Sequence, residues 1–246
     1  MTAIAYAERF TRARLRREDG VLEITLNDGH GGSLVWDEPA HRGLPELFRE
    51  VAGDPDNRVV ILTGAGESFC ASHATTGWPA MNSRGWDKIF TEGRRLLANL
   101  LSVEVPMIAA INGPATWHAE LAVLCDIVLA AEHAYIQDRP HFPSAVPADG
   151  VHTVWPALLG PNRGRYFLLT SEKLDVREAK QLGVVHEVLP AGALQDRAWA
   201  LARELAAAKP LVLKYSRLAL TQQLKRTILD DLPFGLLLEG LAALDN

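Results

Sequence analysis

Two histidines lie in predicted turns where a catalytic side chain could be presented. His118 follows a strand and an Asn-Gly-Pro turn in INGPATWHAEL (111–121), and His141 lies in the loop QDRPHFPSAVPADG (137–150). A neutral imidazole titrates near neutral pH, so His141 is suited to act as a general base. Asp149, eight residues later, would hold its tautomer and stabilise the imidazolium that forms.

His118 is expected at the start of a short helix, a position where anion-binding sites usually carry small residues. The backbone dipoles of a helix start are expected to lower the pKa of His118. The neutral imidazole would then donate a hydrogen bond to an oxyanion or an enolate. The alternative reading is structural: His118 caps a helix, and His141 with Asp149 only orders a loop.

Other catalytic motifs are missing from the sequence. The histidines and cysteines lack His-x-x-x-His and Cys-x-x-Cys spacing, so we predict no metal site. The segment TGAGES (63–68) lacks the Lys-Ser/Thr of a phosphate loop. No Gly-x-Ser-x-Gly nucleophile elbow occurs.

The composition is that of a globular protein. The chain has 246 residues, of which 48% are hydrophobic, enough for a sizeable core. A formal charge of −5 without runs of Lys or Arg argues against nucleic-acid and anionic-membrane partners. Cys70 and Cys125 lie in apolar surroundings, and the first residues lack the apolar core of a secretory signal, so we expect a cytoplasmic protein.

Strands and helices alternate along the chain, which predicts an α/β protein with parallel strands. A hairpin turning at Asp19-Gly20 comes first, and beyond residue 190 the chain becomes helical, with two further helices expected between Leu211 and Leu244. The predicted elements between these are a helix at 43–54, a strand at 59–64, a helix at 86–103 and strands at 106–113 and 126–137.

Several motifs in this order resemble the crotonase, or enoyl-CoA hydratase, superfamily: VVILTGAGESFCAS, IAAINGPA, ELAVLCDIVLAAEHAYIQ, GPNRGRYFLLT and DVREAKQLGVVHEVLP. The resemblance implies a spiral of ββα units over residues 1–190. It also implies a helical region over 191–246 that packs on the core and on neighbouring subunits, in a homotrimer or a dimer of trimers. Members of the superfamily stabilise oxyanions with two backbone amides.

The chain departs from that superfamily at the site. Trp117 and His118 replace a glycine-rich turn, His73 follows Ala71-Ser72 where a small residue is expected, and His141 replaces the glutamate of a Pro-Glu pair. Together with SLVWDEPAH and HTVWPALLG, these segments are similar to the β-diketone hydrolases of the 6-oxocamphor hydrolase group. Such enzymes use water, without a cofactor, to cleave a carbon–carbon bond between two carbonyls in a retro-Claisen reaction.

By this resemblance the substrate is a small, apolar, cyclic or bicyclic 1,3-diketone. The implied catalytic residues are His41, His118, His141, Asp149 and Glu239, and the implied substrate-binding residues are Trp36, Trp78, Phe142 and Trp155. Two other readings stay open. The chain could be a CoA-ester hydratase, isomerase or lyase, as the fold alone would favour, or a non-catalytic binding protein with the same fold.

Overall fold

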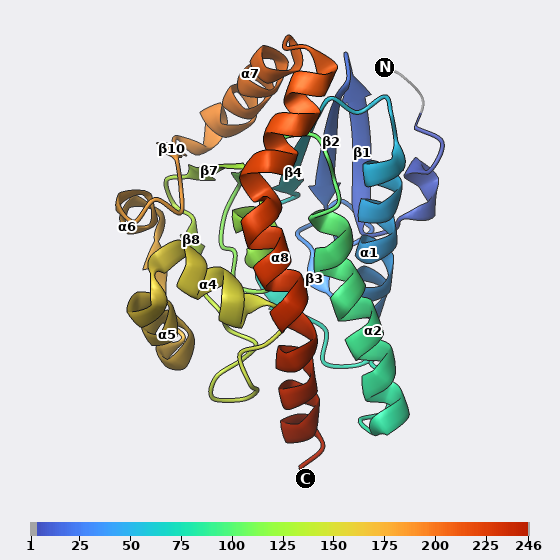
Figure 1. The fold of residues 1–246 in the computed structure, drawn as a ribbon, viewed down its shortest axis with the longest axis vertical. Helices are drawn as coiled ribbons and strands as arrows, with labels where there is room; N and C mark the ends of the chain where they lie inside the picture. The colour runs from blue at the N-terminus through green and yellow to red at the C-terminus, as the bar shows by residue number, and fades with distance from the viewer. Residues whose placement is uncertain (1–3, 246) are drawn as a thin grey trace.

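A six-stranded sheet forms the centre of the computed structural model, which describes residues 4–245 (Figure 1). Its order is β1-β2-β4-β6-β7-β10; β1 is antiparallel to β2, and the remaining pairs are parallel. The strands are β1 (Ala13–Glu18), β2 (Val21–Leu26), β4 (Val59–Gly64), β6 (Met107–Ile111), β7 (Ile127–Ala131) and β10 (Glu187–Leu189). The α/β class with parallel strands is confirmed.

The hairpin of β1 and β2 turns at the predicted dipeptide. Asp19 and Gly20 both have positive φ angles, 50° and 80°, as a two-residue turn between right-twisted strands requires. Every residue of β4 is buried, which fits a central parallel strand covered on both faces.

Helices surround this sheet and extend below it. They are α1 (Glu38–Gly53), α2 (Ser83–Leu100), α3 (Glu120–Val123), α4 (Val151–Leu159), α5 (Pro161–Thr170), α6 (Val176–Gln181), α7 (Leu194–Ala206) and α8 (Pro210–Ala243). Two 3-10 turns, η1 (Ala7–Arg9) and η2 (Ala191–Ala193), and two small sheets complete the fold: β3 (Val35–Trp36) with β5 (Ser72–His73), and β8 (Tyr135–Ile136) with β9 (Leu174–Asp175).

Several predicted elements have different limits in the structure, such as the helix expected over 86–103, which is α2 (Ser83–Leu100). The helix expected over 43–54 begins at Glu38, because the Asp37 carboxylate caps the amide of Ala40 at 2.9 Å and Pro39 suits a first turn. The strand expected over 126–137 is divided into β7 and β8. A tight turn, in which the amide of Ala134 donates to the Ala131 carbonyl, separates them.

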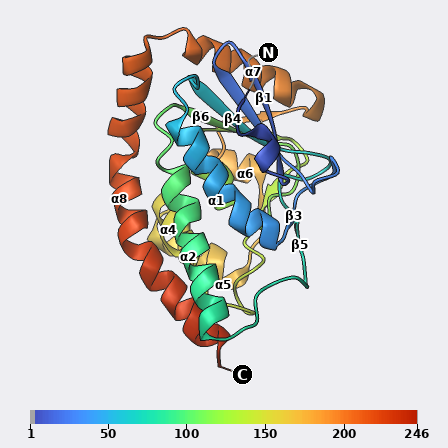
Figure 2. The ribbon, with the colours of Figure 1, turned by 90° about the vertical axis from the view of Figure 1, so that its right-hand side faces the viewer.

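The prediction of two helices after Leu211 is wrong. A single helix, α8, runs through Pro233 over 34 residues, although an internal proline removes a backbone hydrogen bond. Figure 2 shows α8 beside α2 and α4, and it packs against both. The indole nitrogen of Trp86 donates to the Leu236 carbonyl at 3.2 Å, so contacts near the proline hold the helix continuous.

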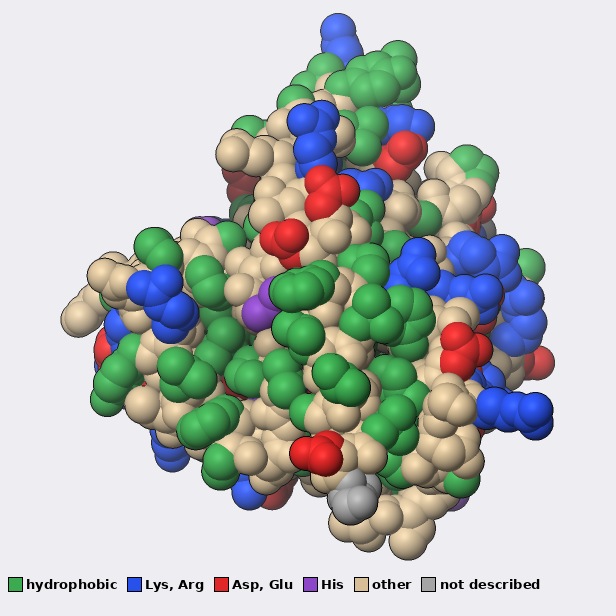
Figure 3. Space-filling view, turned by 60° about the horizontal axis from the view of Figure 1, so that its bottom comes forward, with side chains coloured by type: hydrophobic (Ala, Val, Ile, Leu, Met, Phe, Trp, Pro, Cys, Tyr) green, Lys and Arg blue, Asp and Glu red, His purple; other side chains and the backbone are tan. Residues whose placement is uncertain are grey.

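The outer side of α8 carries an exposed apolar stripe. Phe234, Leu237 and Leu241 are 64%, 60% and 72% exposed, and their spacing of three and four residues places them on one helix face. Hydrophobic side chains gather in the centre of Figure 3, the view onto this end of the molecule. Within residues 4–245, no helix has the length and hydrophobicity that crossing a bilayer requires.

Candidate active site

The turn before α3 uses its backbone amides internally. The amides of Thr116 and Trp117 both donate to the carbonyl of Cys70, at 2.8 and 3.1 Å. These two amides therefore join the turn to the end of the neighbouring segment and are not available to bind an oxyanion. His118 follows with a positive φ of 49°, and its side chain offers polar atoms that can act in their place.

Three buried histidines share one arrangement, in which Nδ1 contacts a carboxylate and Nε2 remains for another partner. All three are at most 8% exposed. The pairs are His41 with Glu92 at 2.9 Å, His118 with Glu120 at 2.6 Å, and His141 with Asp138 at 2.7 Å. A carboxylate on Nδ1 orients the ring and stabilises the imidazolium form. Each of the three imidazole rings is thus oriented so that Nε2 can transfer a proton or make a hydrogen bond.

Asp138, and not Asp149, holds Nδ1 of His141. Both oxygens of Asp138 lie within 2.9 Å of that nitrogen. Burial lowers the pKa of His141, but the hydrogen bond and charge of Asp138, with smaller effects from Asp149 and Glu239, raise it to about 9. The expectation that Asp149 fixes the tautomer is wrong because Asp138, three residues before the histidine, occupies that nitrogen.

Asp149 and Glu239 nevertheless reach His141. One ring nitrogen of His141 and one carboxylate oxygen from each acid all lie within 4.8 Å of one another. Burial and the charge of Asp149 raise the pKa of Glu239, and Glu239 Oε2 is buried without a hydrogen-bond partner among the described residues. The charge of Asp149 so close to Glu239 favours the protonated form of the Glu239 carboxyl. We call His141, Asp149 and Glu239 the His141 cluster.

The same three atoms are the one set within residues 4–245 that lie close enough together to hold a metal ion. Glu239 comes from α8, whereas His141 and Asp149 lie in the loop between β8 and α4. The long C-terminal helix therefore supplies part of the site.

The pKa of His118 is raised, contrary to the sequence-based expectation. Burial lowers it, but the charge and hydrogen bond of Glu120, together with the charge of Asp149, outweigh burial. The helix dipole was expected to dominate, but α3 has only four residues, and dipole effects at a helix end are small compared with a contacting carboxylate.

Trp36 connects two of the histidines. Its ring lies against His118, with centroids 3.7 Å apart, and meets the ring of His41 edge-on at 6.1 Å. Trp78 packs edge-on against the other side of His41 at 5.6 Å. Both tryptophans that were predicted to line the site thus contact its histidines.

His73 belongs to the same cluster, although the sequence did not identify it as a site residue. Its ring is stacked between Trp117 at 4.4 Å and Trp78 at 5.2 Å, both at 11°. Burial, with a smaller effect from His118, lowers the pKa of His73. His73 is therefore suited to remain a neutral, flat wall of the cluster.

Two predicted lining residues lie elsewhere. Trp155 is buried in α4 and packs on Phe167, with ring centroids 4.5 Å apart. Phe142 is 43% exposed and borders a surface groove with Ala242 and Ala243 of α8. Trp155 thus packs in the core and Phe142 lies at the surface, and their role in substrate binding stays a prediction.

The partner carboxylates were missed in the sequence analysis. Asp138 and Glu120 had a local signal, since each lies two or three residues from its histidine. Glu92 had none, because it is 51 residues from His41 and is brought there by the packing of α2 on α1.

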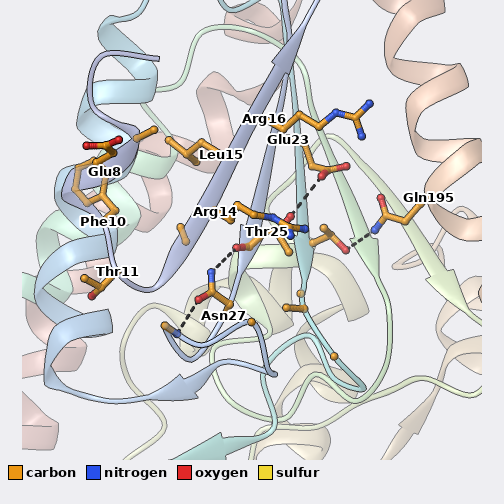
Figure 4. Close-up of a pocket in the computed structure, with 18 of the residues that line it drawn as sticks. Glu8, Phe10, Thr11, Arg14, Leu15, Arg16, Glu23, Thr25, Asn27 and Gln195 are labelled. Carbon is orange, nitrogen blue, oxygen red and sulfur yellow. Dashed lines mark hydrogen bonds between the residues drawn. The ribbon is translucent and has the colours of Figure 1, made fainter. Parts of the chain in front are cut away.

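A cavity of about 820 Å³ lies away from these histidines. It opens over β1, β2 and β4 and is bordered by residues of α7 such as Gln195 (Figure 4). Many of its polar groups already bond to each other: Gln195 donates to Thr63, and Trp199 donates to Glu23. Titratable side chains with shifted pKa values gather instead at the histidine cluster, so we assign the chemistry there.

Comparison with known proteins identifies the family of the chain. The enoyl-CoA hydratase/isomerase family profile matches residues 16–234. The chain belongs to this family. It therefore has the crotonase fold, in which the neighbouring structures are also built.

Individual relatives differ in their named activities. A β-diketone hydrolase from the cyanobacterium Anabaena, bound to (S)-3-oxocyclohexyl acetic acid, is 44% identical, with a TM-score of 0.96 over 100% of this chain and 99% of that one. An enoyl-CoA hydratase/isomerase from Mycobacterium paratuberculosis is 27% identical, with a TM-score of 0.87 over 96% and 95%. A carnitinyl-CoA dehydratase from Salmonella arizonae is 32% identical over 80% of this chain and 76% of its own length.

Proposed function

We propose that the protein is a cofactor-independent hydrolase that cleaves the carbon–carbon bond of a bicyclic 1,3-diketone. The observation that carries the proposal is the set of three buried histidines, each with Nδ1 on a carboxylate, two of which, His41 and His118, pack against Trp36. The amides of Thr116 and Trp117 are bonded to Cys70, and in this proposal the side chain of His118 stabilises the developing charge. Similarity to a β-diketone hydrolase over the whole chain supports the same conclusion.

In this mechanism His141 removes a proton from water, which attacks one carbonyl. Asp138 stabilises the resulting imidazolium through Nδ1, while Asp149 and Glu239 lie near enough to orient the water. The tetrahedral intermediate then breaks the carbon–carbon bond between the two carbonyl groups. One carbon becomes a carboxylic acid, and the bonding electrons pass to the other fragment as an enolate.

His118 stabilises that enolate by donating a hydrogen bond from Nε2, since Nδ1 is committed to Glu120. The proton that His141 took from water then returns to the enolate carbon, which gives a ketone. The sum is addition of one water molecule to the diketone, with no other reactant, and it leaves His141 ready for another turnover.

The ligand of the Anabaena hydrolase indicates a substrate class. The ketone of this keto acid has a ring carbon on each side. Joining the carboxyl carbon to the one that is farther from the acetic acid group, with loss of water, gives a bicyclic 1,3-diketone. The carbon between the two carbonyls is then a bridgehead, which resists enolisation and leaves both carbonyls electrophilic. The indoles of Trp36 and Trp78 offer such an apolar ring two flat surfaces.

The test is incubation of purified protein with this bicyclic diketone, followed by mass spectrometry. We expect a product one water heavier for wild type and none for His141→Ala. His133→Ala, at an exposed histidine, is the matched control and should retain activity. Absence of the keto acid with wild-type protein would refute the proposal.

The CoA-ester reaction remains a second candidate because relatives of the chain include a carnitinyl-CoA dehydratase. Crotonyl-CoA in a parallel assay distinguishes the two. Hydration of crotonyl-CoA without diketone cleavage would favour this second function, and the binding-protein reading would require that a folded sample be inert to both substrates.

We also propose that the chain assembles into a homotrimer or a dimer of trimers. The exposed stripe of Phe234, Leu237 and Leu241 supports association, because exposed apolar patches usually mark an interface. Light scattering should give three or six times the 26.9 kDa chain mass. Leu241→Glu should lower that mass, whereas Leu169→Glu, at an exposed position on α5, serves as control.

A further inference from the structure

His118 and Glu120 form a second buried pair, which interacts electrostatically with Asp149 and His141. We infer that Glu120 is a positioning residue that keeps His118 as an imidazolium, so that the enolate meets a charged donor. This inference rests on the proposed function, and it adds a residue and a charge state to it.

Burial of Glu120 is the first argument. Glu120 is 2% exposed and His118 is 8% exposed, and the Oε1 to Nδ1 distance is 2.6 Å. A carboxylate withdrawn from water is costly unless a cation pairs with it. The structure places Nδ1 of His118 against this carboxylate; a protonated ring supplies the pairing cation there and leaves Nε2–H as the charged donor.

Trp36 supplies the second argument. Its ring centroid is 3.7 Å from that of His118, at an interplanar angle of 34°. The negative face of an indole attracts a cation placed over it, and this attraction increases when water is excluded. Trp36 is only 2% exposed. The ring of His118 therefore has a carboxylate at one edge and an aromatic face against its plane, and both favour the cation.

Other charged groups around His118 act in both directions. The charge of Asp149, from the loop before α4, favours the imidazolium, whereas His141, in the loop after β8, opposes it. His73 on β5 also interacts with His118, but its own pKa is lowered and it stays neutral. The carboxylate in direct contact, Glu120, is the group whose removal should change the charge of His118.

A permanent cation at this position predicts binding of enolates as well as their formation. A monocyclic diketone such as 1,3-cyclohexanedione has an acidic hydrogen between its carbonyls and is largely ionised at neutral pH. Its negative charge is shared by both carbonyls, which makes attack by water unfavourable. We therefore expect 1,3-cyclohexanedione to bind as an enolate and to remain unhydrolysed.

The experiment combines nitrogen NMR of histidine side chains with titration of this enolate. Full-length protein labelled with ¹⁵N-histidine is measured at pH 7, and the signal lost in His118→Gln assigns the ring. We expect wild type to show the imidazolium pattern and Glu120→Gln to show a neutral ring. Enolate affinity should fall about tenfold in Glu120→Gln, since charged hydrogen bonds are roughly twice as strong as neutral ones.

Two further variants make the result specific. Glu120→Asp keeps the charge and should keep the imidazolium, which guards against misfolding of Glu120→Gln. Glu92→Gln removes the matching carboxylate from His41 and should leave the His118 signal unchanged.

A neutral His118 in wild type, or an imidazolium that persists in folded Glu120→Gln, would overturn the inference. The proposed function fails separately: it fails if His118 is cationic and binds the enolate but the bicyclic diketone is not cleaved.

Discussion

Replacing Asp138 by Asn tests how the site controls its base. The pKa of His141 rises from 6.5 to about 9, which corresponds to a preference of about 3 kcal/mol for the imidazolium. Asp138 makes the largest favourable contribution to this rise, and Asp149 and Glu239 add to it. Asp138→Asn removes the charge but keeps the side-chain size, so we expect the maximal kcat/KM to fall by about 30- to 300-fold.

The pH dependence gives a second readout. A base must be neutral to accept a proton, so at pH 7 about one wild-type molecule in a hundred has the reactive His141. Wild-type kcat/KM for the bicyclic diketone should rise about tenfold per pH unit and level off near pH 9. In Asp138→Asn the plateau should be lower and should begin at a lower pH.

Asp175→Asn is the matched control, because Asp175 is an exposed cap of α6 whose function Asn can fulfil. Its profile should equal that of wild type. A wild-type kcat/KM that stays flat from pH 6 to 9, or an unshifted limb in Asp138→Asn, would refute the assignment of His141 as a base tuned by Asp138.

Three other substitutions test a buried acid of the site, an ion pair that stabilises the fold, and an indole of the site. Burial raises the pKa of Glu239 above its ordinary 4.5. The stability that the protonated carboxyl contributes is therefore complete below pH 4.5 and is lost as the pH rises and the buried group must ionise. Compared with wild type, Glu239→Gln should have about 1 to 2 kcal/mol more unfolding free energy at pH 8 and little more at pH 4.5. Arg217→Met removes a buried guanidinium that donates to half-buried Asp126 at 2.7 Å and should cost about 1.5 to 3 kcal/mol in urea denaturation, whereas Lys214→Met, at an exposed ion pair, should leave the urea midpoint near wild type. Trp78→Ala removes an indole from the site and should raise KM about two- to tenfold, with kcat less affected.

The elements of the sheet could be predicted because their signals are local. Asp19-Gly20 marks the hairpin, and the unbroken apolar run of β4 marks a buried parallel strand. The continuity of α8 could not be predicted, since Pro233 is a local signal for a break. Packing of α8 against α2 and α4, which the sequence does not show, holds the two halves together.

The candidate site shows the same limit. Histidines were identifiable by residue type, and the resemblance brought in Glu239 from a distant helix. Their protonation was predicted wrongly for His118 because the decisive group is Glu120, a carboxylate that looks like an ordinary helical residue in the sequence. Likewise, Glu92 reaches His41 only after α2 packs on α1. The pKa of a buried group depends on such contacts more than on its place in a helix.

The position of Glu239 links the chemistry to the proposed assembly. Glu239 lies on α8 between Leu237 and Leu241, whose side chains are exposed while its own Oε2 is buried beside the His141 cluster. One face of α8 thus supplies Glu239 to the His141 cluster, and another face carries the exposed apolar stripe. Association through that stripe would restrict fraying of the C-terminal turns and hold Glu239 near Asp149. A dissociated Leu241→Glu variant should therefore lose activity while His141 and Asp138 remain paired. Activity would then depend in part on contacts between subunits.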